Sequence, residues 1–237
     1  MDFFSGRLKE LSGGRILDVA TGGGYAIKRM MESFKDYEKF IGIDIVDKEK
    51  LDKFQEGFDK KKVELIYMDA ENMGFEDNTF DAVSISNSLH HLKNLDKVLS
   101  EMLRVLKPGG IFLINEMKKD DQTPSQLTHV KVHHWWGKID TQKGITHNET
   151  LTRREILDIT DRIGLAEYDV IEYADLESNP LEKEVIDDIH NSINVYTEKA
   201  LGLPDYEAFK VEGEELRKWL EIHGFTGATQ VIIIGRK

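Results

Sequence analysis

The residues that first suggest chemistry are a carboxylate and a run of glycines. Asp18 ends a short apolar stretch, and three consecutive glycines follow it at positions 22 to 24. Glycine accepts positive φ angles and lets a ligand lie against the main chain, so a strand, a glycine loop and a helix in this order form a nucleotide-type binding turn. A carboxylate at such a turn attracts a cationic ligand.

The spacing of these residues argues against a dinucleotide. A dinucleotide fingerprint needs glycine or alanine three residues after its second glycine, and counting from Gly22 and Gly24 places Ile27 there. Asp18 would also set a negative charge beside a pyrophosphate. S-adenosylmethionine (SAM) has no phosphate and carries a sulfonium and an ammonium group, which a carboxylate stabilises. The pattern therefore favours SAM over a nicotinamide cofactor.

Histidine is the second residue type that could do chemistry. Six of the eight histidines lie in one part of the chain, namely His90, His91, His129, His133, His134 and His147. Such imidazoles can act as bases near neutral pH, bind transition metals or pack as structural residues. His129 and His133 are four residues apart and would share one face of a helix. A metal held there would need a further ligand, for which the candidates are Asp140, His147 and Glu149.

Composition limits the classes of protein that fit. The 237 residues, 40% of them hydrophobic, can bury one substantial core, so we expect a single domain over residues 1–237. Cysteine is absent, which excludes disulfides, thiolate zinc sites and cysteine nucleophiles and suits a reducing cytoplasm. The net charge is −12, with the acid excess between Glu167 and Glu221, so nucleic acid is disfavoured as a partner. The N-terminal MDFFSGRLKEL lacks a signal-peptide layout, and the longest aliphatic run, Val231 to Ile234, is too short to span a bilayer. We therefore expect a cytoplasmic protein with no membrane partner.

Strand-like and helix-like stretches alternate along the chain. The apolar, strand-like stretches are Arg15–Ala20, Lys39–Ile45, Val63–Met68, Phe80–Ser86, Gly110–Asn115, Tyr168–Tyr173 and Thr229–Gly235. Helical stretches lie near Tyr25–Phe34, Lys48–Phe58 and Asn94–Leu106, and Pro108-Gly109-Gly110 turns the last of these into the fifth strand. Thr152 and Glu155 form a capping-box pattern at the start of another helix. This alternation predicts an α/β fold with a largely parallel sheet.

Five motifs occur in an order that identifies a family. They are LDVATGGG at Leu17–Gly24, IGID at Ile41–Asp44, MDAENMGFEDNTFD at Met68–Asp81, SNSLHHL at Ser86–Leu92 and RVLKPGG at Arg104–Gly110. The chain resembles class I SAM-dependent methyltransferases, in the small-molecule branch that includes quinone-biosynthesis C-methyltransferases. The resemblance implies a Rossmann-like, seven-stranded mixed sheet with the last strand antiparallel and helices on both faces. It also implies methyl transfer by in-line displacement to carbon, oxygen or nitrogen of a small molecule. A SAM-binding sensor or non-catalytic partner subunit is the alternative.

The same resemblance implies which residues bind the cofactor. They are Asp18, Ala20, Gly22, Gly24, Asp44, Ile45, Asp69, Ala70, Ser86 and Asn87. Asp18 would hold the ammonium group, Asp44 the two ribose hydroxyls, and Asp69 with the backbone of Ala70 the adenine amino group. Ala20 departs from the usual glycine, for which we expect a slight backbone adjustment. Solvated strand-end carboxylates, or a turn cap in the case of Asp69, are the structural alternatives.

The family builds its acceptor pocket between the fifth strand and the Thr152 helix, so we expect an acceptor-pocket insert over residues 117–150. Its segment PSQLTHVKVHHWWGKID carries Trp135 and Trp136, of which one is expected to line the acceptor cavity and the other to lie in the core. We rank pocket lining or general-base chemistry first for the histidines, a structural role second and a metal last. The catalytic candidates are accordingly His91, His133 and His134, and no bound metal is predicted.

Residues 175–227 separate the last two strands, which the family usually joins by a short hairpin. Two apolar stripes at helical spacing predict two helices there: Leu181, Val185, Ile189, Ile193 and Tyr196 in the first, and Leu216, Trp219 and Leu220 in the second. A sixth strand parallel to the first five ends at the ligand-binding edge of the sheet, so the insert should emerge beside the acceptor pocket. We expect a lid over that pocket, with a homodimer interface as the alternative.

Overall fold

The seven predicted strands form one mixed sheet in the computed structural model, which describes residues 8–175 and 177–237. The strands are β1 (Arg15–Val19), β2 (Lys39–Asp44), β3 (Val63–Tyr67), β4 (Phe80–Ser86), β5 (Leu106–Met117), β6 (Glu167–Tyr173) and β7 (Gln230–Arg236). Their order is β3-β2-β1-β4-β5-β7-β6, and β7 runs antiparallel to both of its neighbours while the other pairings are parallel. The predicted mixed sheet with an antiparallel last strand is confirmed.

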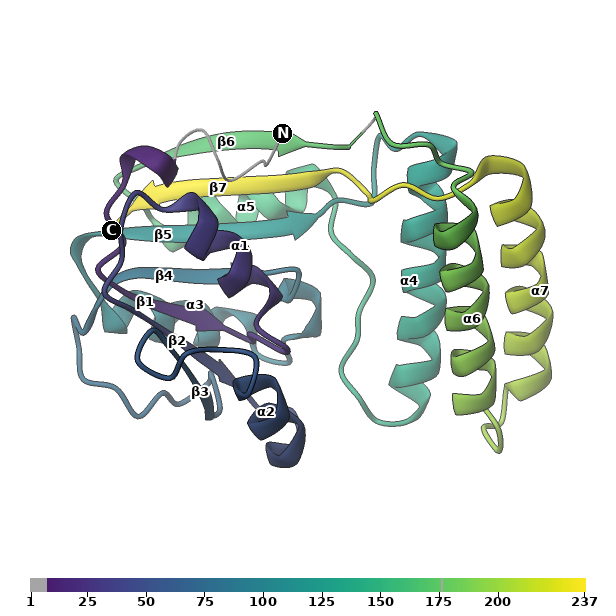
Figure 1. Ribbon diagram of the computed structural model, residues 1–237, viewed down its shortest axis with the longest axis horizontal. Coiled ribbons are helices and arrows are strands. Elements are labelled where there is room, and N and C mark those ends of the chain that lie inside the picture. Colours follow the sequence, from purple (N-terminus) through teal and green to yellow (C-terminus); the bar gives the residue numbers. More distant parts are fainter. Residues whose placement is uncertain (1–7, 176) are drawn as a thin grey trace.

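Helices cover both faces of this sheet (Figure 1). They are α1 (Tyr25–Ser33), α2 (Lys48–Gln55), α3 (Leu95–Val105), α4 (Pro124–Gln142), α5 (Arg153–Ile163), α6 (Lys183–Lys199) and α7 (Tyr206–His223), with short 3-10 turns η1 (Leu8–Glu10) and η2 (Leu89–His91). The predicted capping box starts α5: Thr152 Oγ1 accepts from the Glu155 N–H at 3.2 Å, and Glu155 Oε2 accepts from the Thr152 N–H at 2.7 Å. Most residues of the N-terminal MDFFSGRLKEL lie outside the described part of the chain.

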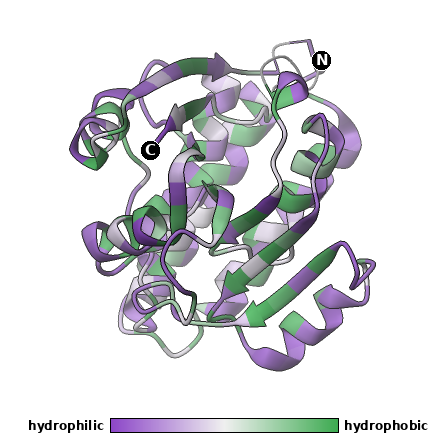
Figure 2. Ribbon diagram, turned by 90° about the vertical axis from the view of Figure 1, so that its left-hand side faces the viewer, coloured by the Kyte–Doolittle hydropathy of each residue, from purple (hydrophilic) through white to green (hydrophobic). Residues whose placement is uncertain are grey.

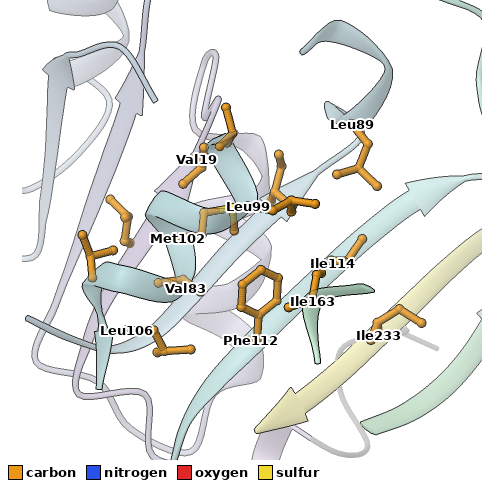
Figure 3. Close-up of a cluster of buried hydrophobic side chains, with 14 of the residues drawn as sticks. Val19, Val83, Leu89, Leu99, Met102, Leu106, Phe112, Ile114, Ile163 and Ile233 are labelled. Carbon is orange, nitrogen blue, oxygen red and sulfur yellow. The ribbon is translucent and has the colours of Figure 1, made fainter. Parts of the chain in front are cut away.

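Alternation along the central strands divides the core into two layers. Leu17 and Val19 of β1 face one layer with Met102 of α3, whereas Ile16 faces the other with Met30 of α1. Figure 3 shows the first layer, with helix side chains packed over β4 and β5, and Figure 2 shows the strands as mostly hydrophobic stretches. Strands buried on both faces hold the carboxyl edge of the sheet in a fixed geometry.

The fifth strand begins at Leu106, so the predicted start at Gly110 is wrong. Leu106 pairs with Phe80 and Ile111 pairs with Ala82, which leaves residues 107–110 as a bulge inside the strand. Gly109 has a φ of 72°, and proline at position 108 has no N–H to give to the ladder. The Pro-Gly-Gly segment therefore bends a strand that has already started.

Helices α4, α6 and α7 form a separate layer, here called the three-helix unit, beyond the end of β5 (Figure 1). Both predicted insert helices are present and pack on α4 and on each other around Trp135, Ile193, Phe209 and Leu216. Ile193, Leu216 and Leu220 of the two stripes are buried, whereas Leu181 lies before the start of α6 and is 54% exposed. The roles of residues 117–150 as an acceptor-pocket insert and of residues 175–227 as a lid or interface stay predictions. Among the described residues, no helix combines the length and apolar character needed to cross a bilayer.

Candidate functional site

The strand order brings the predicted cofactor residues to one edge of the sheet. β1 lies between β2 and β4, and the chain reverses its direction of strand addition there, because β2 and β3 extend the sheet on one side of β1 and β4 and β5 on the other. Loops at such a switch point separate and leave a crevice for a ligand. The residues at the ends of these strands, from Ala20 through Asn87, therefore lie along one carboxyl edge of the sheet, where the topology predicts a crevice for a ligand.

Asp18 is buried beneath the glycine loop, with a relative exposure of 1%. Its Oδ2 accepts from Thr21 Oγ1 and its Oδ1 from Ser84 Oγ, both at 2.7 Å. Burial raises the pKa of Asp18 to about 6, the charge of Asp44 adds to the shift, and the two hydroxyls oppose it. Because Asp18 is buried, the alternative of a solvated carboxylate is wrong for this residue. A nearby cation would stabilise its ionised form.

Asp44 connects the end of β2 to the glycine loop. One carboxylate oxygen accepts from the Gly22 N–H and the other from the Val46 N–H, each at 2.7 Å. Gly24 follows with a φ of 73°, and a side chain there would place its Cβ 2.6 Å from the ring of Phe58. A half-buried carboxylate retains lone pairs after these two bonds and can accept from a diol.

Ala20 occupies the left-handed region with a φ of 54°, which glycine would adopt without strain. The left-handed conformation costs an L-residue about 1–2 kcal/mol, and glycine loses about 0.4–1 kcal/mol through the flexibility of the unfolded chain. We therefore expect Ala20→Gly to stabilise the protein by about 0.5–1 kcal/mol in urea denaturation. Ala26→Gly, within α1, is the matched control and should destabilise by about 1 kcal/mol. If Ala20→Gly were less stable than the wild type, the left-handed backbone of Ala20 would not be a source of strain.

The remaining predicted cofactor residues follow β2, β3 and β4. Ile45 is 65% exposed, and Ala70 is half-buried. Asp69 Oδ1 accepts from the Glu71 N–H at 2.8 Å, so this carboxylate caps a turn. Ser86 Oγ accepts from Asn115 Nδ2 at 2.8 Å, and Asn87, with a φ of 46°, accepts from the Met117 N–H at 2.9 Å. The pairings with Asn115 and Met117 fasten the end of β4 to β5.

Four histidines converge beside the end of β4, and we call them the histidine cluster: His90, His91, His133 and His147. One ring nitrogen of each lies within 4.8 Å of one from every other. Two of them come from η2, one from α4 and one from the loop after α4. The Asn148 N–H donates to the His90 carbonyl at 2.9 Å and holds that loop against η2.

Buried carboxylates stand behind two members of the cluster. His90 Nδ1 lies 2.9 Å from Glu116 Oε1, and both side chains are fully buried. His147 Nδ1 lies 2.9 Å from Asp140 Oδ2, and Asp140 also pairs with Lys199. Sequence reasoning missed Glu116. Its one signal in the sequence was a charged residue directly after the apolar stretch Gly110–Asn115.

The other two histidines of this part of the chain lie outside the cluster. His129 Nδ1 accepts from the Ala228 N–H at 3.0 Å, and its ring centroid is 6.3 Å from that of His133. His134 Nε2 accepts from the Thr150 N–H at 3.2 Å. His129, which the sequence offered with His133 as a possible metal-binding pair, is thus not one of the four clustered histidines.

Two members of the cluster, His91 and His133, are weak bases. Burial, followed by repulsion from neighbouring histidines, lowers the pKa of His91 to about 4 and that of His133 to about 2. An efficient general base has a pKa near the working pH, so both imidazoles are neutral and poorly matched to proton abstraction at pH 7. What they offer instead is nitrogen lone pairs.

A cavity of about 420 Å³ lies beside the cluster, lined by His134, Gly137, Thr141, His147 and Phe209 among others. On another side of the cluster, the ring of Trp136 lies 6.0 Å from His133 and stacks on Tyr196 at 5.0 Å. Trp136 Nε1 is buried and has no partner among the described residues, whereas Trp135 is a core residue. An unpaired indole N–H at this place is a donor available to a ligand.

Comparison with known proteins supplies an independent view of the sheet. Residues 17–114 match the family profile described as a methyltransferase domain. Demethylmenaquinone methyltransferase of Bacteroides fragilis is 39% identical over 124 residues, which cover 49% of this chain and 49% of that protein. The chain thus matches about half the length of this curated relative.

Solved structures share the architecture over nearly the whole chain. The YcgJ protein from Bacillus subtilis superposes with a TM-score of 0.60 at 19% identity, covering 94% of this chain and 91% of that chain. Phosphoethanolamine N-methyltransferase 2 of Haemonchus contortus, solved in complex with S-adenosyl-L-methionine, superposes with a TM-score of 0.54 at 21% identity, covering 94% and 49%. At these identities the superpositions establish the fold.

Proposed function

We propose that this chain, which carries a methyltransferase domain over residues 17–114, transfers a methyl group from SAM to a small molecule. The observation that carries the proposal is the buried carboxylate of Asp18 beneath the glycine loop, with Asp44 at its rim. Two carboxylates repel phosphate and favour a ligand that carries positive charge and a diol. SAM has both features.

The cofactor would lie across the switch point of the sheet. Asp18 would stabilise its positive charge, Asp44 would accept from the ribose hydroxyls, and Asp69 with Ala70 would meet the adenine. Ser86 and Asn87 would form the floor, where bonds to β5 already hold them. The solved Haemonchus enzyme, with SAM bound in the same fold, supports this placement.

The reaction then needs alignment more than acid–base groups. The acceptor atom attacks the methyl carbon in line, the bond from carbon to sulfur breaks, and its electron pair stays on sulfur to give S-adenosylhomocysteine. Holding both reactants in this geometry can supply up to about 7–11 kcal/mol. The weakly basic histidines favour an acceptor that is already deprotonated or carries no proton. His91, His133 and His134 stay our predicted acceptor-side residues, in a lining role.

The acceptor would enter from the three-helix unit. The cavity beside His147 and the unpaired indole N–H of Trp136 lie on that side. The polar side chains of the cavity and the indole N–H favour a small molecule with a hydrogen-bond acceptor next to the methylated atom. Carbon, oxygen and nitrogen all remain open as methylation sites. A cytoplasmic setting, a homodimer, and the absence of nucleic-acid and membrane partners stay predictions.

Replacing Asp44 with alanine tests the cofactor assignment. We expect SAM binding, measured by calorimetry, to weaken by about 1.5–3 kcal/mol, because charge-assisted hydrogen bonds to the ribose are lost and the Gly22 N–H is released. The control is Asp47→Ala, which removes the nearby cap of α2 but no ribose contact, and should bind SAM as the wild type does. Wild-type protein that binds neither SAM nor S-adenosylhomocysteine at millimolar concentration would refute the function.

Turnover separates an enzyme from a sensor. The protein is incubated with SAM and a metabolite extract, and S-adenosylhomocysteine and methylated products are read by mass spectrometry. An enzyme forms both in equal amounts. Tight SAM binding without either product across extracts would favour the sensor or partner-subunit alternative.

A further inference from the structure

We propose that the histidine cluster binds one divalent transition-metal ion, with Zn²⁺ as the ion to test. The sequence ranked a metal last among the roles of these histidines, and its metal alternative rested on His129 and His133. The structure instead assembles His90, His91 and His147 around His133. The metal site does not depend on cofactor binding, since the SAM-binding residues are a different set of side chains. His91 and His133, which we also predict on the acceptor side, would border the acceptor as metal ligands.

The spacing of the nitrogens suits a tetrahedral ion. His147 Nε2 lies 3.4 Å from His133 Nδ1, which is about the separation of two nitrogens on a zinc ion with bonds of about 2.1 Å. The other ligand nitrogens lie within 4.8 Å of one another and need to approach by at most about 1.4 Å to reach the 3.4 Å separation of this pair. Ring centroids of the six histidine pairs lie between 4.2 and 6.1 Å apart, so all four rings are close neighbours.

Oxygen atoms orient three of the four rings from behind. Glu116 contacts His90 Nδ1, Asp140 contacts His147 Nδ1, and the ring of His91 donates to the backbone carbonyl of Thr146. Such a bond fixes the proton on one nitrogen and leaves the lone pair of the other for a metal, a pattern typical of histidine metal ligands. The two carboxylates also supply negative charge near a dication.

The orphaned nitrogen of His90 is the second, independent sign of a ligand. Nε2 is buried and has no hydrogen-bond partner among the described residues, although Nδ1 is bound to Glu116. A buried nitrogen left unsatisfied costs free energy, and hydrogen bonding within the cluster accounts only for the contact between His133 and His147. A metal would satisfy all four rings together.

The donor set limits the choice of ion. Four imidazoles and no oxygen ligand suit Zn²⁺, Co²⁺, Ni²⁺ or Cu²⁺ and disfavour Mg²⁺ and Ca²⁺. Four protein ligands close a tetrahedral site, so the ion would hold α4 and the loop at 143–152 against the end of β4. It would thereby join the three-helix unit to the sheet.

Direct metal titration tests the site on the full, untagged chain after treatment with a chelator. We expect one equivalent of Zn²⁺ per chain and, with Co²⁺, the visible absorption bands of a tetrahedral nitrogen site. His91→Ala and His133→Ala should each weaken Zn²⁺ binding more than 100-fold, and Asp140→Asn, which disturbs the orientation of His147, by about 10–100-fold. His129→Asn, one turn away from His133 on α4, is the matched control and should bind Zn²⁺ normally.

Two results would overturn the proposal. One is wild-type protein that takes up neither Zn²⁺ nor Co²⁺ at 100 µM, taken as about the limit of a specific site. The other is binding that persists in both His91→Ala and His133→Ala, because the ion would then lie elsewhere. Circular dichroism of the metal-free variants establishes that they are folded, and the cobalt spectrum of the wild type stands without any variant. SAM calorimetry on the metal-free protein keeps this outcome separate from that of the proposed function.

Discussion

Replacing Asp18 with asparagine is expected to weaken SAM binding by about 2–5 kcal/mol and, at the same time, to stabilise the ligand-free protein at pH 7.5. Removing one partner of a buried charge pair has an effect of this size on binding. The opposite effect on stability arises because the carboxylate must ionise inside the fold. Its pKa of about 6 lies above the 3.8 of a free aspartate, so ionisation at neutral pH costs on the order of 3 kcal/mol.

The sign of the pH dependence follows from the same shift. Between about pH 4 and 6 the folded protein binds more protons than the unfolded chain, so the contribution of Asp18 is fully present below pH 4 and is lost as pH rises through 6. A cationic ligand lowers this pKa, so SAM should bind more weakly below pH 6 and release a proton near that pH. Asp18→Asn should abolish both effects.

Calorimetry in two buffers of different ionisation enthalpy measures the released proton, and urea denaturation measures stability. Asp81→Asn is the control, because Asp81 pairs with Lys107 and the Arg15 N–H at the start of β1, away from the crevice. It should leave SAM affinity unchanged. Wild-type affinity in Asp18→Asn would show that the buried carboxylate does not meet the cofactor's charge.

Truncation of Trp135 to alanine is expected to destabilise the protein by about 3–5 kcal/mol. The side chain is fully buried between α4 and α7, and its Nε1 donates to the Phe209 carbonyl at 3.1 Å. Loss of so large a group leaves a cavity. Gly213 of α7 packs directly on the indole and has no side chain that could move into the space. The carbonyl of Phe209 also loses its buried donor.

Thermal and urea denaturation measure this loss, with Trp219→Ala as the matched control. Trp219 is half-buried, and its Nε1 donates to the Pro124 carbonyl at 3.3 Å, so its removal should cost only about 1 kcal/mol. SAM should still bind Trp135→Ala at low temperature, because the crevice lies on the sheet. Equal losses in the two variants would show that the three-helix unit has no core of its own.

The sheet could be predicted from the sequence because its signals are local. Each central strand is a short apolar run. The motifs between Leu17 and Gly110 indicate which strands end in polar residues. The capping box at Thr152 is equally local, since its two partners are three residues apart. The bulge before Ile111 escaped prediction because it depends on how β5 meets β4.

The candidate site was predictable only where one loop holds it. The glycine loop was found from spacing and Asp44 from a family motif, whereas the contact of the Ser84 hydroxyl with Asp18 joins residues 66 positions apart. The histidines show the same limit. His90 and His133 were named, yet helical spacing paired His133 with His129, while the fold pairs it with residues from two other segments.

The position of β7 in the sheet determines when during synthesis the sheet can be completed. This last strand lies between β5 and β6, so β6 has no neighbour until the chain has been made to Arg236. Trp135 likewise waits for Phe209, 74 residues later, which at about 5–20 residues per second leaves the apolar face of α4 exposed for roughly 4–15 s during synthesis. A ribosome-bound or prematurely ended chain therefore presents an open β5 edge and an uncovered helix, and both are surfaces that chaperones bind and aggregates recruit.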